Sequence, residues 1–491
     1  MHVLYALAFF IPLALCLQKI VTGAFPFWYD IARDFLAASD NLVKPTLLGP
    51  PSGIPGIFYG PYWIWLLSGA IFISKDPRIV TILVGIMPYF ILFPILLFGF
   101  RSLFPTKILV MLWFLFSIAF SQYATNLWNP HIAPLLFLLL FSVVLQKKAI
   151  ASSLLGGLLC GLITNFHMSF GIGVTIGTLA FLVFLYARKS IGKGVLLGIL
   201  FLMGLLIAYI PFLLFEYRHG FAQIASFLHT MREAVLYNSV VVGQRGLTKE
   251  AIVENFFAPI SSLEQVPRFI GFAIYGAIIG YIICLKRSLL YRVSFSQKEQ
   301  TLLWYLLFLT ASILLVYVSS KNPVWEYHFI GVEILLLFSL AILLKKSPFA
   351  EKLFSFWVFV IGVLTISRFV LGFTLDTRTL PSSFASEVSI IEAVYKDANG
   401  KPFAVFEQSP SIYTYEFDYL FAALAKTNHL PLPITNLDTA TYVYIILPDS
   451  LSKEHAGFVA SKTPSATYYT LKYWQALDKS AIYKQAKKQT K

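Results

Sequence analysis

Two aspartates, Asp30 and Asp34, follow the first apolar segment of the chain at positions i and i+4. If this stretch is helical, both carboxylates lie on one face, one turn apart. A carboxylate held there can act as a general base, taking the proton of a hydroxyl while the oxygen forms a new bond. Arg33 lies between the two acids, so a solvated loop with an internal ion pair explains the same residues. The spacing alone leaves both interpretations open.

The pair stands out because the chain carries little charge elsewhere. It has 491 residues, of which 58% are hydrophobic and 13% charged, and its mean hydropathy is +0.74. Soluble domains are about 45–50% apolar and about 25% charged. The composition therefore predicts a polytopic α-helical membrane protein. The net charge of +14 comes mostly from short Lys and Arg clusters between apolar runs, a pattern of topology determinants and not of a nucleic-acid-binding surface.

We expect about 11 membrane-spanning helices, because a span needs roughly 20 mainly apolar residues. A further apolar run, 60–74, is short and starts with Gly60 and Pro61. We interpret it as an interfacial or re-entrant segment, and whether it spans decides on which side of the membrane Asp30 lies. The expected spans are 3–21, 79–100, 108–123, 131–146, 150–166, 168–187, 194–215, 268–285, 301–318, 328–344 and 353–373.

Basic clusters between the spans orient the chain. With this set of helices all the clusters fall on one side, which the positive-inside rule assigns to the cytoplasm. The extracytoplasmic side then holds the first loop, 22–78, a second long loop, 216–267, and the C-terminal region. We therefore expect a multi-pass protein of the plasma or inner membrane with Asp30 outside. The clusters are Arg101/Lys107, Lys147/Lys148, Arg188/Lys189/Lys193, Lys286/Arg287/Arg292 and Lys345/Lys346/Lys352.

The composition changes near residue 376, where polar residues become common. We divide the chain into a transmembrane domain, 1–375, and a small external α/β domain, 376–491. Two short runs with β-branched and aromatic residues, 401–406 and 441–447, predict buried strands. Helices are expected at 385–397 and 416–427.

Arg218 and His219 follow a long apolar helix on the outer side. The planar guanidinium fork of an arginine suits a phosphate, and a histidine adds a donor whose charge changes near neutral pH. A snorkelling arginine paired with Glu216 explains the same residues. Likewise, Tyr327 and His328 at the start of a later helix fit either a phosphate site or an interfacial aromatic belt.

Neither a resident metal nor a nucleotide has a sequence signature here. The histidines are scattered, with no H-E-x-x-H, and there is no P-loop or G-x-G-x-x-G. A metal site is therefore not assigned. Mg²⁺ or Mn²⁺ on the oxygens of Asp30, Asp34 and Asp40 remains an open alternative, because such ions take oxygen ligands.

The chain resembles the polytopic glycosyltransferases of the C fold (GT-C), among them the protein O-mannosyltransferases and the aminoarabinose lipid A transferase. The likeness covers nearly the whole chain. It is carried by Tyr29-Asp30 followed by Arg33-Asp34, by Gly60-Pro61-Tyr62-Trp63, by Trp128-Asn129-Pro130-His131 and by Glu216-Tyr217-Arg218-His219-Gly220. Position 31, where that family has a second acid, is isoleucine, so Asp34 or another group would take its role.

This resemblance implies a transfer of sugar from a polyprenyl-phosphate donor, with inversion, to a hydroxyl of a lipid, glycan or protein acceptor. Asp30 would be the catalytic base, with Asp34 beside it. Arg218, His219 and His328 would bind the donor phosphate. Further candidates for the cavity lining are Arg33, Tyr59, Asn129, His131, Glu216 and Tyr327.

Three alternatives remain open at this point. A lipid-sugar flippase or other transporter should carry charged residues inside its spanning helices, which are nearly free of charge here. A polymerase or ligase of lipid-linked oligosaccharides would centre on Arg and His of a large external loop, with no essential acid after the first helix. A binding protein without catalysis is compatible with isoleucine at position 31.

Overall fold

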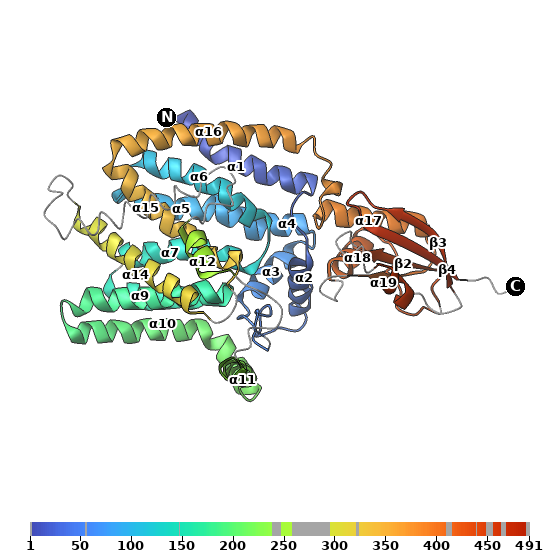
Figure 1. The fold of residues 1–491 in the computed structure, drawn as a ribbon, viewed down its shortest axis with the longest axis horizontal. Helices are drawn as coiled ribbons and strands as arrows, with labels where there is room; N and C mark the ends of the chain where they lie inside the picture. The colour runs from blue at the N-terminus through green and yellow to red at the C-terminus, as the bar shows by residue number, and fades with distance from the viewer. Residues whose placement is uncertain are drawn as a thin grey trace.

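The structure is a computed structural model, and Figure 1 shows its two parts: a bundle of long helices, and an α/β domain at one end of the bundle. The described residues are 2–54, 56–146, 148–237, 247–257, 295–320, 324–408, 415–437, 439–447, 455–462 and 468–487.

Long apolar helices build the bundle. Within the described residues, seven helical segments are long and apolar enough to cross a membrane, which confirms the many-helix membrane fold but not the expected number of spans. The expected span 268–285 lies outside the described residues. The long helices are α1 (His2–Thr22), α6 (Thr106–Thr125), α7 (Ala133–Gln146), α8 (Ala149–Phe166), α9 (Met168–Ala187), α10 (Ile191–Arg218), α14 (Gln297–Ser319), α15 (Glu333–Lys346) and α16 (Pro348–Gly372).

The segment Pro77–Ser102 is continuous but irregular. Prolines without an N–H, Pro88 and Pro94, interrupt the helical hydrogen bonding, and π-helical turns accommodate them. Its parts are α4 (Pro77–Thr81), η1 (Ile82–Ile86), η2 (Pro88–Leu92), α5 (Phe93–Phe98) and η3 (Gly99–Ser102).

Small residues let α8 and α10 approach closely. A Cβ at Gly157 would collide with the carbonyl of Phe201, and one at Gly204 would collide with that of Leu154. Such contacts are a usual means of helix association in membranes, where lipid tails are as apolar as the side chains.

Several basic clusters meet at the end of the bundle away from the α/β domain. Lys107 Nζ lies 2.7 Å from Glu351 Oε1, and Lys346 Nζ lies 3.0 Å from Glu299 Oε2. Lys345 Nζ donates to the carbonyl of Leu103 at 2.7 Å. The connection between α9 and α10, which carries Arg188, lies at this end too (Figure 1).

Two short helices follow α1 in the first loop, at the other end of the bundle: α2 (Tyr29–Asn41) and α3 (Tyr62–Ile73), which pack together. The 12 residues of α3 make a helix of about 18 Å, shorter than the hydrocarbon core of about 30 Å. Its outer face exposes Phe72 and Ile73. These features agree with an interfacial position for this helix.

The C-terminal domain has the expected mixed composition. A parallel pair, β1 (Phe403–Glu407) and β2 (Tyr442–Leu447), coincides with the two predicted strands. The sheet order is β1-β2-β4-β3, so β1 is an edge strand. The antiparallel strands β3 (Tyr468–Gln475) and β4 (Ala481–Lys487) were not predicted. The helices are α17 (Phe384–Ala398), α18 (Tyr415–Asn428) and α19 (His455–Lys462).

One hydrophobic core joins this domain to the first loop. Phe27 and Phe35 pack their rings against Tyr419 of α18, with centroids 5.8 and 5.2 Å apart. Backbone bonds accompany the packing: Phe27 N donates to Ser382 O at 2.9 Å, and Phe384 N donates to Phe25 O at 3.0 Å. Because residues of the first loop and of the C-terminal domain share this core, the division at residue 376 stays a prediction.

Candidate active site

The helix α2 carries the acids, and its sequence explains how it is held. Ile31, Phe35 and Ala38 recur at helical spacing and are buried, so this face packs into the shared core. Asp34 points to the same buried side, whereas Asp30 lies at the start of the helix and remains partly exposed. The stretch that carries the two acids is therefore helical, and the two carboxylates differ in burial.

Arg33 bridges the two aspartates. Its Nη1 lies 2.6 Å from Asp30 Oδ1, while its Nε and Nη2 donate to Asp34 Oδ1 at 2.9 and 2.7 Å. The guanidinium thus holds both carboxylates at once. A partly desolvated pair of this kind fixes geometry more firmly than an exposed ion pair does.

Asp34 is the anchored member. Its side chain is 1% exposed, and its Oδ2 accepts a hydrogen bond from Trp63 Nε1 of α3 at 2.8 Å. Burial raises the pKa of Asp34 to about 6, against the opposing effects of Arg33 and Trp63. This aspartate joins α2 to α3 and has no free oxygen facing solvent, so it supports the site without being open to a substrate.

Asp30 is the accessible member. Its side chain is 22% exposed, and only one of its oxygens, Oδ1, bonds Arg33. Burial raises the pKa of Asp30, and Arg33 opposes this effect. An ionised carboxylate with a free oxygen and an elevated proton affinity has the properties of a general base.

Aromatic side chains surround Asp30. Burial, the Tyr327 phenol and the Asp30 carboxylate raise the pKa of Tyr59, and burial and Asp30 raise that of Tyr327. The Trp128 ring packs against Trp28 and Tyr327, with centroids 5.6 and 5.1 Å apart. Arg33, Tyr59 and Tyr327, three of the candidates for the cavity lining, therefore lie near Asp30, and their role in a substrate cavity stays a prediction.

Other lining candidates form internal bonds. Asn129 Nδ2 donates to Phe166 O at 2.8 Å, and His131 Nδ1 lies 2.6 Å from Asn126 O. His328 Nδ1 accepts from Trp325 N at 2.8 Å, closing the short turn η6 (Glu326–Phe329), and its ring lies 4.2 Å from that of Tyr327. His328 therefore borders the aromatic wall, by which we mean the rings of Tyr59, Trp128 and Tyr327. The His131 ring packs against Trp128, with centroids 5.7 Å apart.

Glu216 has a structural partner. It is fully buried, and its two oxygens accept the backbone N–H groups of Gln223 and Ile224, at the start of α11 (Ala222–Tyr237). Gln223 Oε1 in turn accepts from Phe58 N of the first loop at 2.6 Å. Arg218 and His219 are exposed at the end of α10, where the His219 ring stacks on Phe215 at 4.0 Å. Among the described contacts, none joins Arg218 to Asp30. Further along the chain, the described residues include the helix α12 (Lys249–Phe257).

A cation site at the acids would compete with Arg33. Asp30 and Asp34 both bond its guanidinium, while Asp40 is exposed at the far end of α2. Within the described part of the chain, no three His, Cys, Asp or Glu side chains are grouped to hold a metal ion.

Two residues at this site have roles that sequence reasoning missed. Trp63 anchors Asp34, although the sequence showed Trp63 only as part of a short motif. Glu416 of α18 interacts electrostatically with Asp30, and the Tyr29 and Tyr415 rings next to these acids in sequence lie 5.1 Å apart. Nothing local in the sequence relates a residue of the C-terminal domain to Asp30, because only the fold brings them together.

Two solved structures resemble this chain in fold to different degrees. The chain is similar to the crystal structure of ArnT from Cupriavidus metallidurans in the apo state, with a TM-score of 0.53 and 10% identity, over 95% of this chain and 96% of ArnT. An oligosaccharyltransferase from Archaeoglobus fulgidus in complex with Zn and sulfate gives a TM-score of 0.37 at 13% identity, over 96% of this chain and 72% of that one.

No family model and no curated protein matches the sequence. The likeness to ArnT confirms the fold expected from the sequence motifs, and at this identity it concerns the fold alone.

Proposed function

We propose that this chain, which shares the fold of ArnT, is a membrane glycosyltransferase that moves a sugar from a polyprenyl-phosphate carrier to an acceptor hydroxyl. The observation that carries the proposal is the accessible Asp30, clamped by Arg33 and surrounded by aromatic side chains at one end of the helical bundle. A donor whose lipid tail lies in the bilayer can present its sugar at such a place. The acceptor is a lipid, a glycan or a protein.

In this mechanism Asp30 takes the proton of the acceptor hydroxyl. The acceptor oxygen forms a bond to the anomeric carbon while the bond from that carbon to the phosphate oxygen breaks, and polyprenyl phosphate leaves with the electron pair. A single displacement of this kind inverts the anomeric centre. Asp30 suits the step because its free oxygen is accessible and burial raises its pKa.

Charged and neutral hydrogen-bond donors of the protein would stabilise the leaving phosphate. Arg218 and His219 are exposed at the end of α10 and are open to a charged ligand, and His328 borders the aromatic wall beside Tyr327. Hydrogen-bond donors lower the barrier most effectively when the fold already holds them where negative charge develops in the transition state. Glu216 contributes by fixing the turn that presents Arg218.

The proposed orientation is supported by the basic clusters at the end of the bundle opposite Asp30. Their gathering around Glu299 and Glu351 supports a cytoplasmic assignment for that end. Asp30 and the C-terminal domain would then face the extracytoplasmic side of the plasma or inner membrane. Nucleotide sugars are made in the cytoplasm, so a lipid-linked donor suits this position.

The donor class is directly testable. We expect membranes that contain the wild-type chain to transfer radiolabel from at least one of a panel of polyprenyl-phosphate sugars, and not from the matching nucleotide sugars. Membranes from cells without the gene are the control. Transfer from a nucleotide sugar alone would contradict the donor assignment. Movement of intact lipid-linked sugar across the bilayer without a new glycosidic bond would instead identify a transporter.

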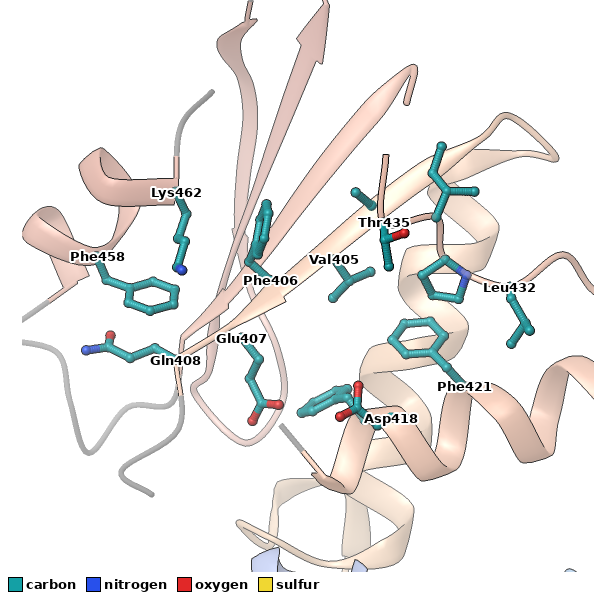
Figure 2. A pocket seen from close by; sticks show the side chains of 14 residues that line it. Val405, Phe406, Glu407, Gln408, Asp418, Phe421, Leu432, Thr435, Phe458 and Lys462 are labelled. Carbon is teal, nitrogen blue, oxygen red and sulfur yellow. The ribbon is translucent and has the colours of Figure 1, made fainter. Parts of the chain in front are cut away.

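A cavity in the C-terminal domain supports an acceptor subsite. It has a volume of about 670 Å³ and runs beside the edge strand β1 (Figure 2). Phe406 and Phe421 supply apolar walls, and Glu407 and Asp418 supply carboxylates from β1 and α18. An apolar cavity with a few polar groups is the usual form of a ligand site. Its position on the domain that packs against α2 places it on the Asp30 side of the molecule.

Filling this cavity tests the subsite. Thr435 is exposed and lines the cavity, so a tryptophan at this position, Thr435→Trp, would occupy it. We expect transfer to fall roughly tenfold, which corresponds to a lost binding free energy of about 1.4 kcal/mol. The donor concentration for half-maximal transfer should not change. Lys426→Trp, on an exposed position of α18 that does not line the cavity, is the matched control. Equal rates in both variants would remove the cavity from the acceptor path.

A further inference from the structure

The strand β1 lies at the edge of the C-terminal sheet and pairs with β2 on one side only. Along a strand in a parallel ladder, the backbone N–H and C=O groups of successive residues point alternately to the two sides. Gln408 N donates to Ile446 O of β2 at 2.9 Å, so the even-numbered residues of β1 face β2. The backbone groups of Val405 and Glu407 therefore point away from the sheet.

The chain itself pairs with the first position on this outer edge. Ile434 N donates to Phe403 O at 2.9 Å, and the stretch 432–435 lines the cavity together with β1. Among the residues that the structure describes, no further backbone hydrogen bond reaches the outward groups of Val405 or Glu407. The last three residues of β1 are also partly exposed. An unpaired edge of this kind is a template for another strand.

The cavity of about 670 Å³ lies along this open part of the edge (Figure 2). On one face of the sheet, Val405 packs with the cluster that contains Phe421 of α18. On the other face, Phe406 packs with Phe458 of α19. Since successive side chains of a strand point to opposite faces, a segment added beside β1 would direct its side chains alternately to α18 and to α19.

The α18 side of the cavity is acidic. Glu407 and Asp418 both line it, and Figure 2 shows their carboxylates directed to the same part of it. The buried Oε2 of Glu407 has no hydrogen-bond partner among the described residues, which is costly for a carboxylate. Burial and the neighbouring acids raise the pKa of Glu407. A cationic side chain of a ligand would supply the missing donor and favour the ionised carboxylate.

The α19 side of the cavity already holds a cation. Lys462 places its ammonium 5.5 Å from the centroid of the Phe406 ring and 5.7 Å from that of Phe458. A second cation on this side would be repelled, because like charges brought together oppose binding. The two sides together therefore favour a segment in which a basic residue is flanked by uncharged ones.

We propose that the free edge of β1 binds an extended polypeptide by strand addition, with a basic side chain directed to Glu407 and Asp418, and that such a polypeptide is the acceptor. Strand addition gains affinity from main-chain hydrogen bonds and specificity from sites for alternate side chains. A polypeptide is favoured over a glycan or a lipid because its backbone matches the outward N–H and C=O groups of Val405 and Glu407. The docking stands on the edge strand and the cavity, whereas the role as acceptor rests on the proposed function.

Three blocked, fluorescently labelled peptides test the docking on the purified full-length protein in detergent. The first is Thr-Val-Lys-Val-Thr, the second has glutamate in place of lysine, and the third is the lysine peptide with every amide N-methylated. Val405→Pro removes an outward N–H that the pairing with β2 does not use, and edge strands tolerate proline. Glu407→Gln keeps the shape and removes the charge. Glu392→Gln, on an exposed position of α17 outside the cavity, is the control.

Binding is measured by fluorescence anisotropy. We expect the wild type and Glu392→Gln to bind the lysine peptide roughly tenfold more tightly than either other peptide, the scale of a charge-assisted hydrogen bond. Glu407→Gln should lose most of the preference for lysine over glutamate. Val405→Pro should weaken binding of the lysine peptide, with a thermal midpoint near that of the wild type. If this variant does not fold, the N-methylated peptide still tests the main-chain bonds.

Equal binding of the N-methylated and unmodified peptides would overturn strand addition, and equal binding of the lysine and glutamate peptides would overturn the basic preference. Absence of binding would overturn the docking site itself. These measurements need no activity, so transfer of label to the threonine hydroxyls is assayed separately. Label on a lipid or glycan but not on the peptide would overturn the role as acceptor and leave the proposed function in place. A bound peptide together with no transfer to any acceptor would refute the proposed function and retain the docking site.

Discussion

Replacing Asp30 by asparagine is expected to lower sugar transfer by roughly 10²- to 10⁴-fold, the contribution typical of a general base. An amide cannot take the acceptor proton, although it has nearly the same shape. The Arg33–Asp34 pair and the Asp34–Trp63 bond do not involve Asp30, so the variant should fold. The measurement is label transfer from a polyprenyl-phosphate sugar in membranes with matched amounts of protein.

Asp40→Asn is the matched control for this substitution. Asp40 lies on the same helix, is exposed in its last turn, and should tolerate the change with full activity. The pH dependence gives an independent check. Because burial raises the pKa of Asp30, the acidic limb of the wild-type rate should lie above the ordinary aspartate pKa of about 3.9. Undiminished transfer by a folded Asp30→Asn variant would reject Asp30 and redirect attention to Arg218 and His219.

Replacing Asp34 by alanine should lower stability by about 3 kcal/mol, because the change removes the buried partner of an ion pair and the acceptor of a buried indole N–H. Arg33 would keep only its bond to Asp30, and Trp63 Nε1 would lose its acceptor. The midpoint of thermal unfolding in detergent measures the effect, with Asp40→Ala as the control on the exposed part of the helix.

This result distinguishes the roles of the two acids. Asp34→Ala should unfold at a lower temperature, whereas Asp30→Asn should unfold like the wild type and lose only activity. The opposite outcome, a stable Asp34→Ala variant with lost transfer, would mean that Asp34 itself takes part in the chemistry. Its exposure of 1% argues against such a role.

The sequence predicted the elements with strong local signals. Long apolar runs defined most helices of the bundle, and the runs 401–406 and 441–447 defined β1 and β2, because buried strands need β-branched and aromatic residues. The strands β3 and β4 were not predicted, because Lys472 and Lys484 interrupt the apolar pattern of their sequences. These lysines pair with Asp397, a contact that no local pattern reveals.

The sequence indicated which residues belong to the candidate site, but not which side chains they bond. Asp30 and Asp34 share a helix as expected, yet only the packing of α3 shows that Asp34 is anchored by Trp63. An ion pair between Glu216 and Arg218 was one of two interpretations of the sequence, whereas the Glu216 oxygens accept hydrogen bonds from backbone amides at the start of α11. Polar side chains near helix ends serve caps and chemistry equally well, and the sequence does not distinguish the two uses.

The shared core of α2 and the C-terminal domain has a consequence for how the protein is made. Phe27 and Phe35 are synthesised early, but their partner Tyr419 belongs to the last part of the chain. At about 5–20 residues per second, α2 waits on the order of tens of seconds for α18 to leave the ribosome. The membrane helices are inserted during that interval. The helix that carries Asp30 therefore reaches its final packing last, and if Asp30 is the base, an unfinished chain should be inactive on the membrane.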